Sequence, residues 1–129
     1  MAARMKILVV DDDDSMRQAI SRLLNAAGYE NATFPTAEAC LASGVTSNAD
    51  CLICDLHLPA MSGLDLLAEL RRRNCGIPVI LMTAFDERGL HLRALESGAA
   101  AYLAKPFLGT TLLESIQGLG GAGSGADEI

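Results

Sequence analysis

The sequence has no long hydrophobic run and no extended cluster of basic residues. No apolar stretch approaches the ~20 residues of a membrane-spanning helix, and the N-terminus lacks the apolar segment and cleavage site of a secretory signal. Ten Lys and Arg stand against 16 Asp and Glu, which gives a net charge of −6 and a pI of about 4.7. Because clustered basic residues grip phosphate backbones, nucleic-acid binding is disfavoured. We therefore expect a cytoplasmic protein that contacts neither a membrane nor a nucleic acid.

Disulfide staples are also not expected, although the chain has four cysteines. A chain of 129 residues that is 50% hydrophobic has enough apolar material for a packed core without them. Cys51 and Cys54 have the spacing of a metal or redox pair, but they lie in a segment that is typical of a strand. Residues three apart on a strand point to opposite faces. Core packing is therefore the expected role of this pair.

The length and the apolar content predict one domain, at residues 1–118. Five glycines follow from Gly118 onward with few large apolar residues. Residues 119–129 are therefore expected to form a flexible glycine-rich tail or the start of a linker.

Short β-branched or apolar runs alternate with segments of helical periodicity along this domain. Such alternation predicts an α/β fold, a doubly wound parallel sheet of five strands with helices on both faces and right-handed crossovers. The expected strands are 6–11, 31–34, 51–55, 79–83 and 101–104, and the expected helices are 16–27, 36–42, 62–73, 87–97 and 111–116. Asp14 or Ser15 is the expected N-cap of the first helix.

Polar residues stand where the expected strands end. Asp11 and Asp12 close the first strand, Asp55 the third and Thr83 the fourth, and Lys105 follows the fifth. Ligands bind outside the carboxyl ends of parallel strands. If the first, third and fourth strands are neighbours, all five residues meet at one rim.

Three carboxylates at close range repel one another and favour either protonation or a hard cation. Oxygen ligands select magnesium or manganese over zinc. An aspartate there can attack phosphorus and form an acyl phosphate, whose charge the metal, Lys105 and Thr83 would neutralise. Acids after strands also serve as helix caps, and that is the expected role of Asp13 and Asp14.

Four segments resemble the response-regulator receiver domains of two-component signal transduction, of the CheY-like and FixJ-like kind. Residues 7–17 (ILVVDDDDSMR) resemble the first strand and acidic pair, and residues 55–63 (DLHLPAMSG) the phosphoacceptor motif DxxxPxxxG. Residues 82–84 (MTA) resemble the switch-hydroxyl segment, and residues 98–107 (GAAAYLAKPF) the Tyr-x-x-Lys-Pro-Phe segment. The likeness extends over residues 6–117 and implies a flavodoxin-like sheet with strand order 2-1-3-4-5.

The resemblance implies that a sensor histidine kinase passes a phosphoryl group to Asp55 with Mg²⁺ bound, for which Mn²⁺ can substitute. Asp12 and Asp55 would supply side-chain ligands, His57 its backbone carbonyl, and Asp11 a contact through water. Such a protein catalyses only its own phosphorylation and dephosphorylation and is not an enzyme acting on other substrates.

The resemblance also implies a switch. Thr83 would move toward the phosphoryl oxygens, Tyr102 would swing inward, and a cis bond before Pro106 would aim Lys105 at the site. The face of the fourth helix, fifth strand and fifth helix, with Leu108 on it, would bind a downstream effector domain or protein. Homodimerisation stays open, and the alternative for Tyr102 is a half-buried ring with its hydroxyl in water.

Two rival functions remain at this point. A haloacid-dehalogenase-like phosphatase also pairs an aspartate nucleophile with magnesium, but it would carry the nucleophile in the first acidic cluster and normally has a longer chain. A phosphorylation-independent protein-binding module would keep the fold without the chemistry. The motif at Asp55 favours a receiver domain over the phosphatase. The complete set of polar residues at the strand ends favours a receiver domain over the phosphorylation-independent module.

His57 and Phe85 occupy positions that flank the path of attacking water in the resembled family. We expect the bulky Phe85 to restrict water, so that Phe85→Glu loses its phosphoryl group faster than the unsubstituted protein. His57 acting as a proton acceptor is the alternative to a simple loop residue. Decay of the isolated phosphoprotein checks the expectation, which is wrong if the two proteins decay at the same rate.

Overall fold

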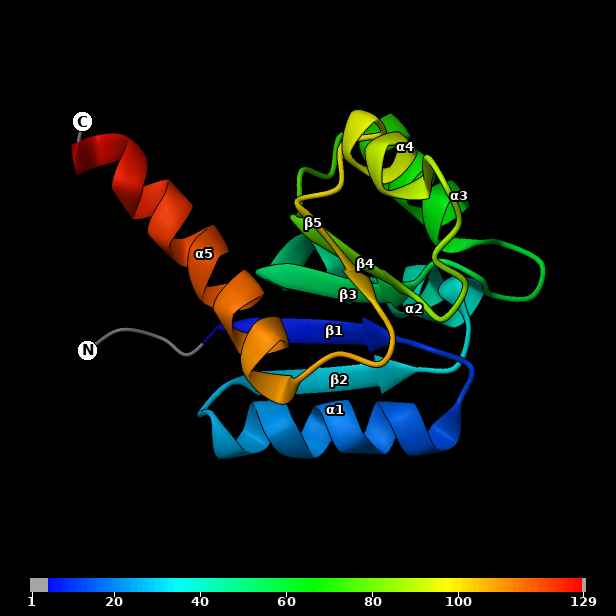
Figure 1. Ribbon diagram of the computed structural model, residues 1–129, viewed down its shortest axis with the longest axis horizontal. Coiled ribbons are helices and arrows are strands. Elements are labelled where there is room, and N and C mark those ends of the chain that lie inside the picture. Colours follow the sequence, from blue (N-terminus) through cyan, green and yellow to red (C-terminus); the bar gives the residue numbers. More distant parts are fainter. Residues whose placement is uncertain (1–4, 129) are drawn as a thin grey trace.

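The computed structural model describes the backbone of residues 5–128 and the side chains of residues 5–119. Strands and helices alternate along the whole chain (Figure 1). The elements, in order, are β1 (Lys6–Val10), α1 (Asp14–Ala26), β2 (Glu30–Phe34), α2 (Ala37–Ser43), the 3₁₀ turn η1 (Val45–Asn48), β3 (Cys51–Asp55), α3 (Gly63–Arg72), β4 (Val79–Thr83), α4 (Leu90–Glu96), β5 (Ala101–Ala104) and α5 (Gly109–Glu128).

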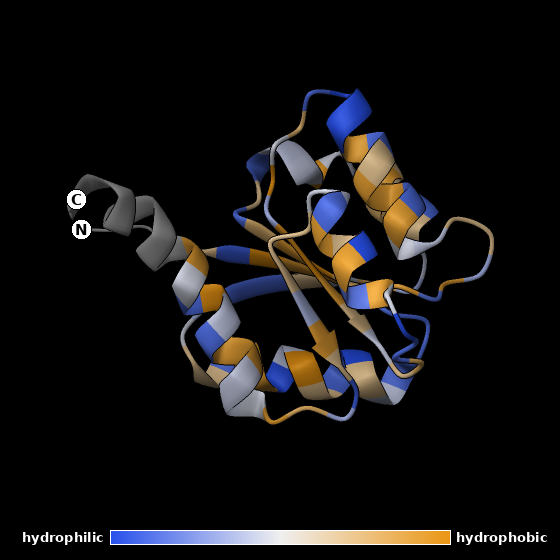
Figure 2. Ribbon diagram, turned by 45° about the horizontal axis from the view of Figure 1, so that its top comes forward, coloured by the Kyte–Doolittle hydropathy of each residue, from blue (hydrophilic) through white to orange (hydrophobic). Residues whose placement is uncertain are grey.

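The five strands form one parallel sheet with the order β2-β1-β3-β4-β5, which confirms the predicted flavodoxin-like topology. Apolar side chains fill a core on each face of this sheet. Side chains of α2, α3 and α4 pack on one face, and those of α1 and α5 pack on the other. In Figure 2 the central strands are largely orange, and the helices around them carry both orange and blue residues. Strands covered on both faces carry continuous apolar runs, as β3 and β4 do.

The cysteine pair of β3 packs as the period of a strand requires. Cys51 lies in the core beside α1 and α5, whereas Cys54 lies in the core on the opposite face. Burial raises the pKa of the Cys51 thiol to about 12, and it also raises the pKa of the Cys54 thiol well above its ordinary value. Both thiols are protonated and inert at neutral pH, so core packing is confirmed.

Helices α1, α4 and α5 begin at other residues than expected: α1 begins at Asp14 and not at residue 16, and α5 begins at Gly109 and not at residue 111. Of the residues expected to cap α1, Asp13 does so, because its carboxylate accepts from the amides of Ser15 and Met16, whereas Asp14 and Ser15 lie inside the helix. Helix α4 begins at Leu90 and not at residue 87, because Gly89 has a φ of +80°, which interrupts right-handed helix. Helix α3 is capped by Ser62, which forms a reciprocal capping box with Asp65.

The backbone of α5 continues as a helix to Glu128, through the glycine-rich segment. Each glycine in a helix interior costs roughly 1 kcal/mol relative to alanine, so little intrinsic propensity supports the end of this helix. Side-chain packing of α5 is described only to Leu119, which lies against the core of α1 and α5. A flexible tail at residues 119–129 stays a prediction.

The turn between β3 and α3 depends on one close backbone approach. The amide of Gly63 donates to the carbonyl of Leu56 at 2.9 Å. A Cβ atom on Gly63 would lie 2.6 Å from the carbonyl oxygen of Asp55 and 2.9 Å from the Cα of Leu56. Both neighbours are backbone atoms, which cannot turn aside as a flexible side chain can. The glycine therefore allows α3 to start directly behind Asp55.

We expect Gly63→Ala to lower the free energy of unfolding by about 2 kcal/mol, because overpacking against a fixed backbone costs roughly 1–3 kcal/mol. Gly76→Ala is the matched control, since a Cβ there meets nothing within 4 Å. Urea titration of both variants measures the difference. Equal stabilities would show that the turn relaxes without cost.

Candidate functional site

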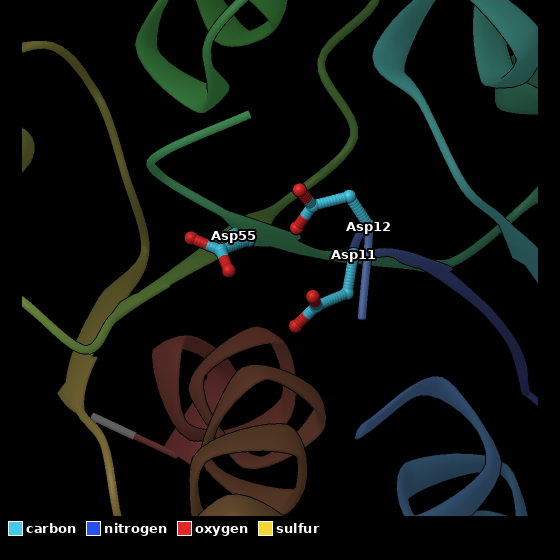
Figure 3. Close-up of side chains that lie close together, drawn as sticks. All are labelled: Asp11, Asp12 and Asp55. Carbon is cyan, nitrogen blue, oxygen red and sulfur yellow. The ribbon is translucent and has the colours of Figure 1, made fainter. Parts of the chain in front are cut away.

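Three carboxylates lie together at the carboxyl ends of β1 and β3 (Figure 3). Asp11 and Asp12 directly follow β1, and Asp55 is the last residue of β3. One oxygen from each of the three lies within 4.8 Å of the others. Asp11 and Asp55 are buried and Asp12 is exposed, so the cluster opens to solvent on one side.

Lys105 connects the two buried acids. Its Nζ donates to Oδ2 of Asp11 at 2.9 Å and to Oδ2 of Asp55 at 2.8 Å. The lysine follows β5, and its amide donates to the carbonyl of Thr83 at 2.7 Å. The peptide bond between Lys105 and Pro106 is cis. One ammonium group thus faces acids from two strands that neighbour each other in the middle of the sheet.

The charge balance at this rim is incomplete. Burial raises the pKa of the Asp11 carboxyl, and the hydrogen bonds from Lys105 and from the Asp13 amide offset only part of that rise. Burial opposes the positive charge of Lys105, but its bonds to Asp11 and Asp55 together outweigh burial and raise its pKa. The lysine is therefore charged, and it pairs with two of the three carboxylates of the cluster.

Backbone groups fix the direction of Asp55. Its Oδ1 accepts from the amide of His57 at 2.9 Å, while its Oδ2 accepts from Lys105. The chain after Asp55 is attached to the neighbouring strand, because the Leu56 amide donates to the Met82 carbonyl at 2.7 Å. Asp55 thus has both carboxylate oxygens aimed by hydrogen bonds before any ligand arrives.

Arg17 is a site residue that sequence reasoning missed. Its guanidinium donates to the backbone carbonyl of Asp11 at 2.6 Å and pairs with Asp14. This contact ties the acidic loop to the first turns of α1. The spacing of Asp14 and Arg17, three residues apart on a helix, was a readable signal for the ion pair, but nothing in the sequence indicates the bond to a carbonyl.

Thr83 and the two residues suggested to control water lie beside the acids. Thr83 is buried at the end of β4, and its Oγ1 accepts from the Phe85 amide at 2.9 Å. The Phe85 ring is 63% exposed and meets the His57 ring edge-on, with centroids 5.2 Å apart. The two side chains therefore form one contact at the mouth of the site.

Tyr102 points away from the acids. Its hydroxyl donates to Oδ1 of Asp86 at 2.7 Å, and its ring stacks on His91 of α4 with centroids 4.8 Å apart and planes 11° apart. Burial and the bond to Asp86 raise the pKa of Tyr102 to about 12. The ring is half-buried, and the hydroxyl meets Asp86 at the exposed surface. Neither Asp86 nor His91 was indicated by the sequence as a partner of Tyr102.

The donor set fits a divalent cation. All three groups are carboxylates, the ligands that hard cations take in proteins. The raised pKa of Asp11 shows that its negative charge is under-compensated, and the exposed Asp12 provides access from solvent. The acidic triad is therefore suited to a divalent metal site.

Comparison with known proteins decides the family. The sequence profile described as "Response regulator receiver domain" matches residues 7–117. The chain belongs to the response regulator receiver domain family. A receiver domain is a phosphorylation-signalling module of two-component systems and not a classical enzyme, and it implies a cognate histidine kinase.

Similar proteins include Nodulation protein W of Bradyrhizobium diazoefficiens, 37% identical over 85% of this chain and 48% of that protein. The transcriptional regulatory protein FixJ of Azorhizobium caulinodans is 33% identical over 91% of this chain and 56% of its own length. The chain thus spans about half the length of these two relatives. The chemotaxis protein CheY4 of Vibrio cholerae, a solved structure, has a TM-score of 0.83 at 31% identity and covers 91% of this chain and 99% of its own.

Among the described residues, no helix is long and apolar enough to cross a membrane.

Removal of Lys105 tests the charge balance. In Lys105→Met, Asp11 and Asp55 stay buried without their cation, so we expect the free energy of unfolding at pH 7 to fall by about 2 kcal/mol in chelator. A carboxyl whose pKa is raised by folding stabilises the fold below its unfolded pKa, and this stability is lost as pH rises through the folded pKa. The pKa of Asp11 should rise further in the variant.

The stability gap between Lys105→Met and the unsubstituted protein should therefore narrow as pH falls toward 4. Denaturant titrations across pH measure it, with Lys6→Met, at the other lysine of the chain, as the matched control. A gap that is independent of pH would contradict this account.

Proposed function

We propose that this receiver domain accepts a phosphoryl group on Asp55 from a sensor histidine kinase, with Mg²⁺ bound at Asp11 and Asp12. The observation that carries the proposal is the position of Asp55, buried at the end of β3, with Lys105 at 2.8 Å and two further carboxylates beside it. Bound Mg²⁺, with Mn²⁺ as its substitute, would draw ligands from Asp12, Asp55 and the carbonyl of His57, and from Asp11 through water. When bound, the ion supplies positive charge to the transferring phosphoryl oxygens.

The chemistry follows from the groups that surround Asp55. A carboxylate oxygen attacks phosphorus, the bond to the imidazole nitrogen of the kinase breaks, and its electron pair stays on the ring, which leaves neutral because its other nitrogen is protonated. Lys105 then faces the added negative charge, and the Thr83 hydroxyl donates to a phosphoryl oxygen. Both groups have donor capacity for this, because the Thr83 hydroxyl only accepts from the Phe85 amide and the Lys105 ammonium uses two of its three N–H groups on Asp11 and Asp55.

Phosphorylation adds roughly −1.5 to −2 of charge to an acidic rim, so contacts made only in the phosphorylated state have to favour the active conformation. We assign these to Thr83 and Lys105, with Tyr102 moving inward. The responding surface is the face of α4, β5 and α5, where Leu92 and Leu108 are exposed. It would bind an effector domain or protein, or a second copy, in the cytoplasm, without direct contact to nucleic acid or membrane.

The contact between His57 and Phe85 favours a long-lived phosphorylated state. The two rings lie edge to face on the residues that follow Asp55 and Thr83 by two positions. In the resembled family these two positions flank the path of the water that attacks the acyl phosphate. The contact between the rings supports a role of both His57 and Phe85 in setting the lifetime of phosphorylated Asp55.

Incubation with Mg²⁺ and acetyl phosphate tests the phosphoacceptor. One phosphoryl group per chain is expected, stable in acid and labile in base as an acyl phosphate is, and absent in Asp55→Asn. Asp50→Asn is the matched control, since Asp50 is an exposed carboxylate just before the opposite end of β3. It should become phosphorylated normally. Intact-protein mass spectrometry measures the adduct.

The two rival functions give other results. Repeated turnover of phosphate esters would indicate a phosphatase of the haloacid-dehalogenase kind. No adduct under any condition, with a folded protein, would indicate a phosphorylation-independent binding module and would overturn the proposal.

A further inference from the structure

The contacts of Tyr102 point to a clamp: we infer that Asp86 and His91 are positioning residues that hold Tyr102 outward until Asp55 is phosphorylated. The inference deepens the proposed function, because it rests on Tyr102 being the switch residue. It adds two residues to the switch, one in the loop between β4 and α4 and one in the first turn of α4.

The clamp engages both ends of the tyrosine side chain. The hydroxyl donates to Oδ1 of Asp86 at 2.7 Å, a charge-assisted bond that is stronger than a neutral one. The ring lies nearly parallel to the His91 imidazole, with 4.8 Å between centroids. Tyr102 leaves this position only by giving up the bond and the stacked face together.

Neither partner is required for packing of the core. Asp86 and His91 are both exposed, whereas Leu90, which stands next to His91, is buried under α4. An exposed aromatic pair and one exposed hydrogen bond are worth little enough to be reversed by phosphorylation. These contacts are strong enough to bias the position of Tyr102 but contribute little to the stability of the fold.

The clamp is linked to the phosphorylation site through the loop between β4 and α4. Phe85 precedes Asp86, and the Phe85 amide donates to the Thr83 hydroxyl at 2.9 Å. When Thr83 turns to a phosphoryl oxygen, the Phe85 amide loses this partner. The loop is then free to shift the neighbouring Asp86 away from Tyr102. A local change at Thr83 thus releases the tyrosine.

The position of Tyr102 is measured first, without phosphorylation. NMR of protein with labelled tyrosine, in a Tyr29→Phe background that leaves Tyr102 as the single tyrosine, reports contacts from its ring to Asp86, to His91 and to the Thr83 methyl group. We expect contacts to Asp86 and His91 in the parent protein. In His91→Ala and in Asp86→Ala, the contact to the remaining partner weakens and a contact to the Thr83 methyl appears.

Two matched variants separate the clamp from general effects of substitution on α4. His91→Phe keeps a flat ring and should retain the outward tyrosine. Leu92→Ala changes the next exposed residue of α4, which has no ring contact to Tyr102, and should also retain it. All of these sites are exposed, so the variants should fold, as a thermal melt verifies.

The effect on phosphorylation is measured second. The clamp stabilises the conformation in which Tyr102 lies outward, and phosphorylation favours the other conformation. Variants that release Tyr102 should therefore be phosphorylated by acetyl phosphate about fivefold faster. In a Tyr102→Ala background, His91→Ala should have no further effect, which a purely structural role of His91 would not explain.

The outcomes are distinguishable. An outward Tyr102 in both His91→Ala and Asp86→Ala overturns the clamp, whatever the phosphorylation data show. A freed Tyr102 with an unchanged rate overturns its regulatory role. Absence of any adduct on Asp55 in the parent protein refutes the proposed function instead, and the NMR contacts still decide whether the clamp exists.

Discussion

A single ammonium group between two buried carboxylates is the interaction on which the rest of this receiver domain depends. Asp11 and Asp55 end neighbouring strands, and their mutual repulsion would open the rim if Lys105 were absent. The lysine comes from the far end of the sheet, after β5. Its bonds therefore hold the fifth βα unit against the first and third. The same arrangement leaves the cluster short of positive charge, which is the condition for binding a divalent cation and a phosphoryl group.

The molecule separates a rigid platform from a weakly held switch. β1, β3 and β4 are buried almost throughout and define where the acids stand. The switch side chains are held by few contacts to the exposed segment after β4: Thr83 by the Phe85 amide, and Tyr102 by Asp86 and the His91 ring. Small energies can reverse these contacts without loss of the core. A signalling domain needs this contrast, because its two states have to be close in free energy while the fold remains intact.

Most of the architecture could be predicted from local patterns. The apolar run of β3 and the capping box that begins α3 are readable within a few residues. The errors at helix starts also have local causes. Asp13 was one of four consecutive acids, any of which can cap a helix, and only the backbone geometry selects it. Gly89 was not recognised as a left-handed residue that delays the start of α4.

The sequence by itself determined the strand–helix alternation, the strand order expected of the family and the polar residues at the strand ends. Tertiary structure alone decided that Lys105 bridges both buried acids, which lie 94 and 50 residues away in the chain. It also decided that Tyr102 turns outward to Asp86 and stacks on His91. The physical reason is range: periodicity and caps act over a few residues, whereas these contacts join side chains from separate elements, whose distances are determined only when the helices pack on the sheet.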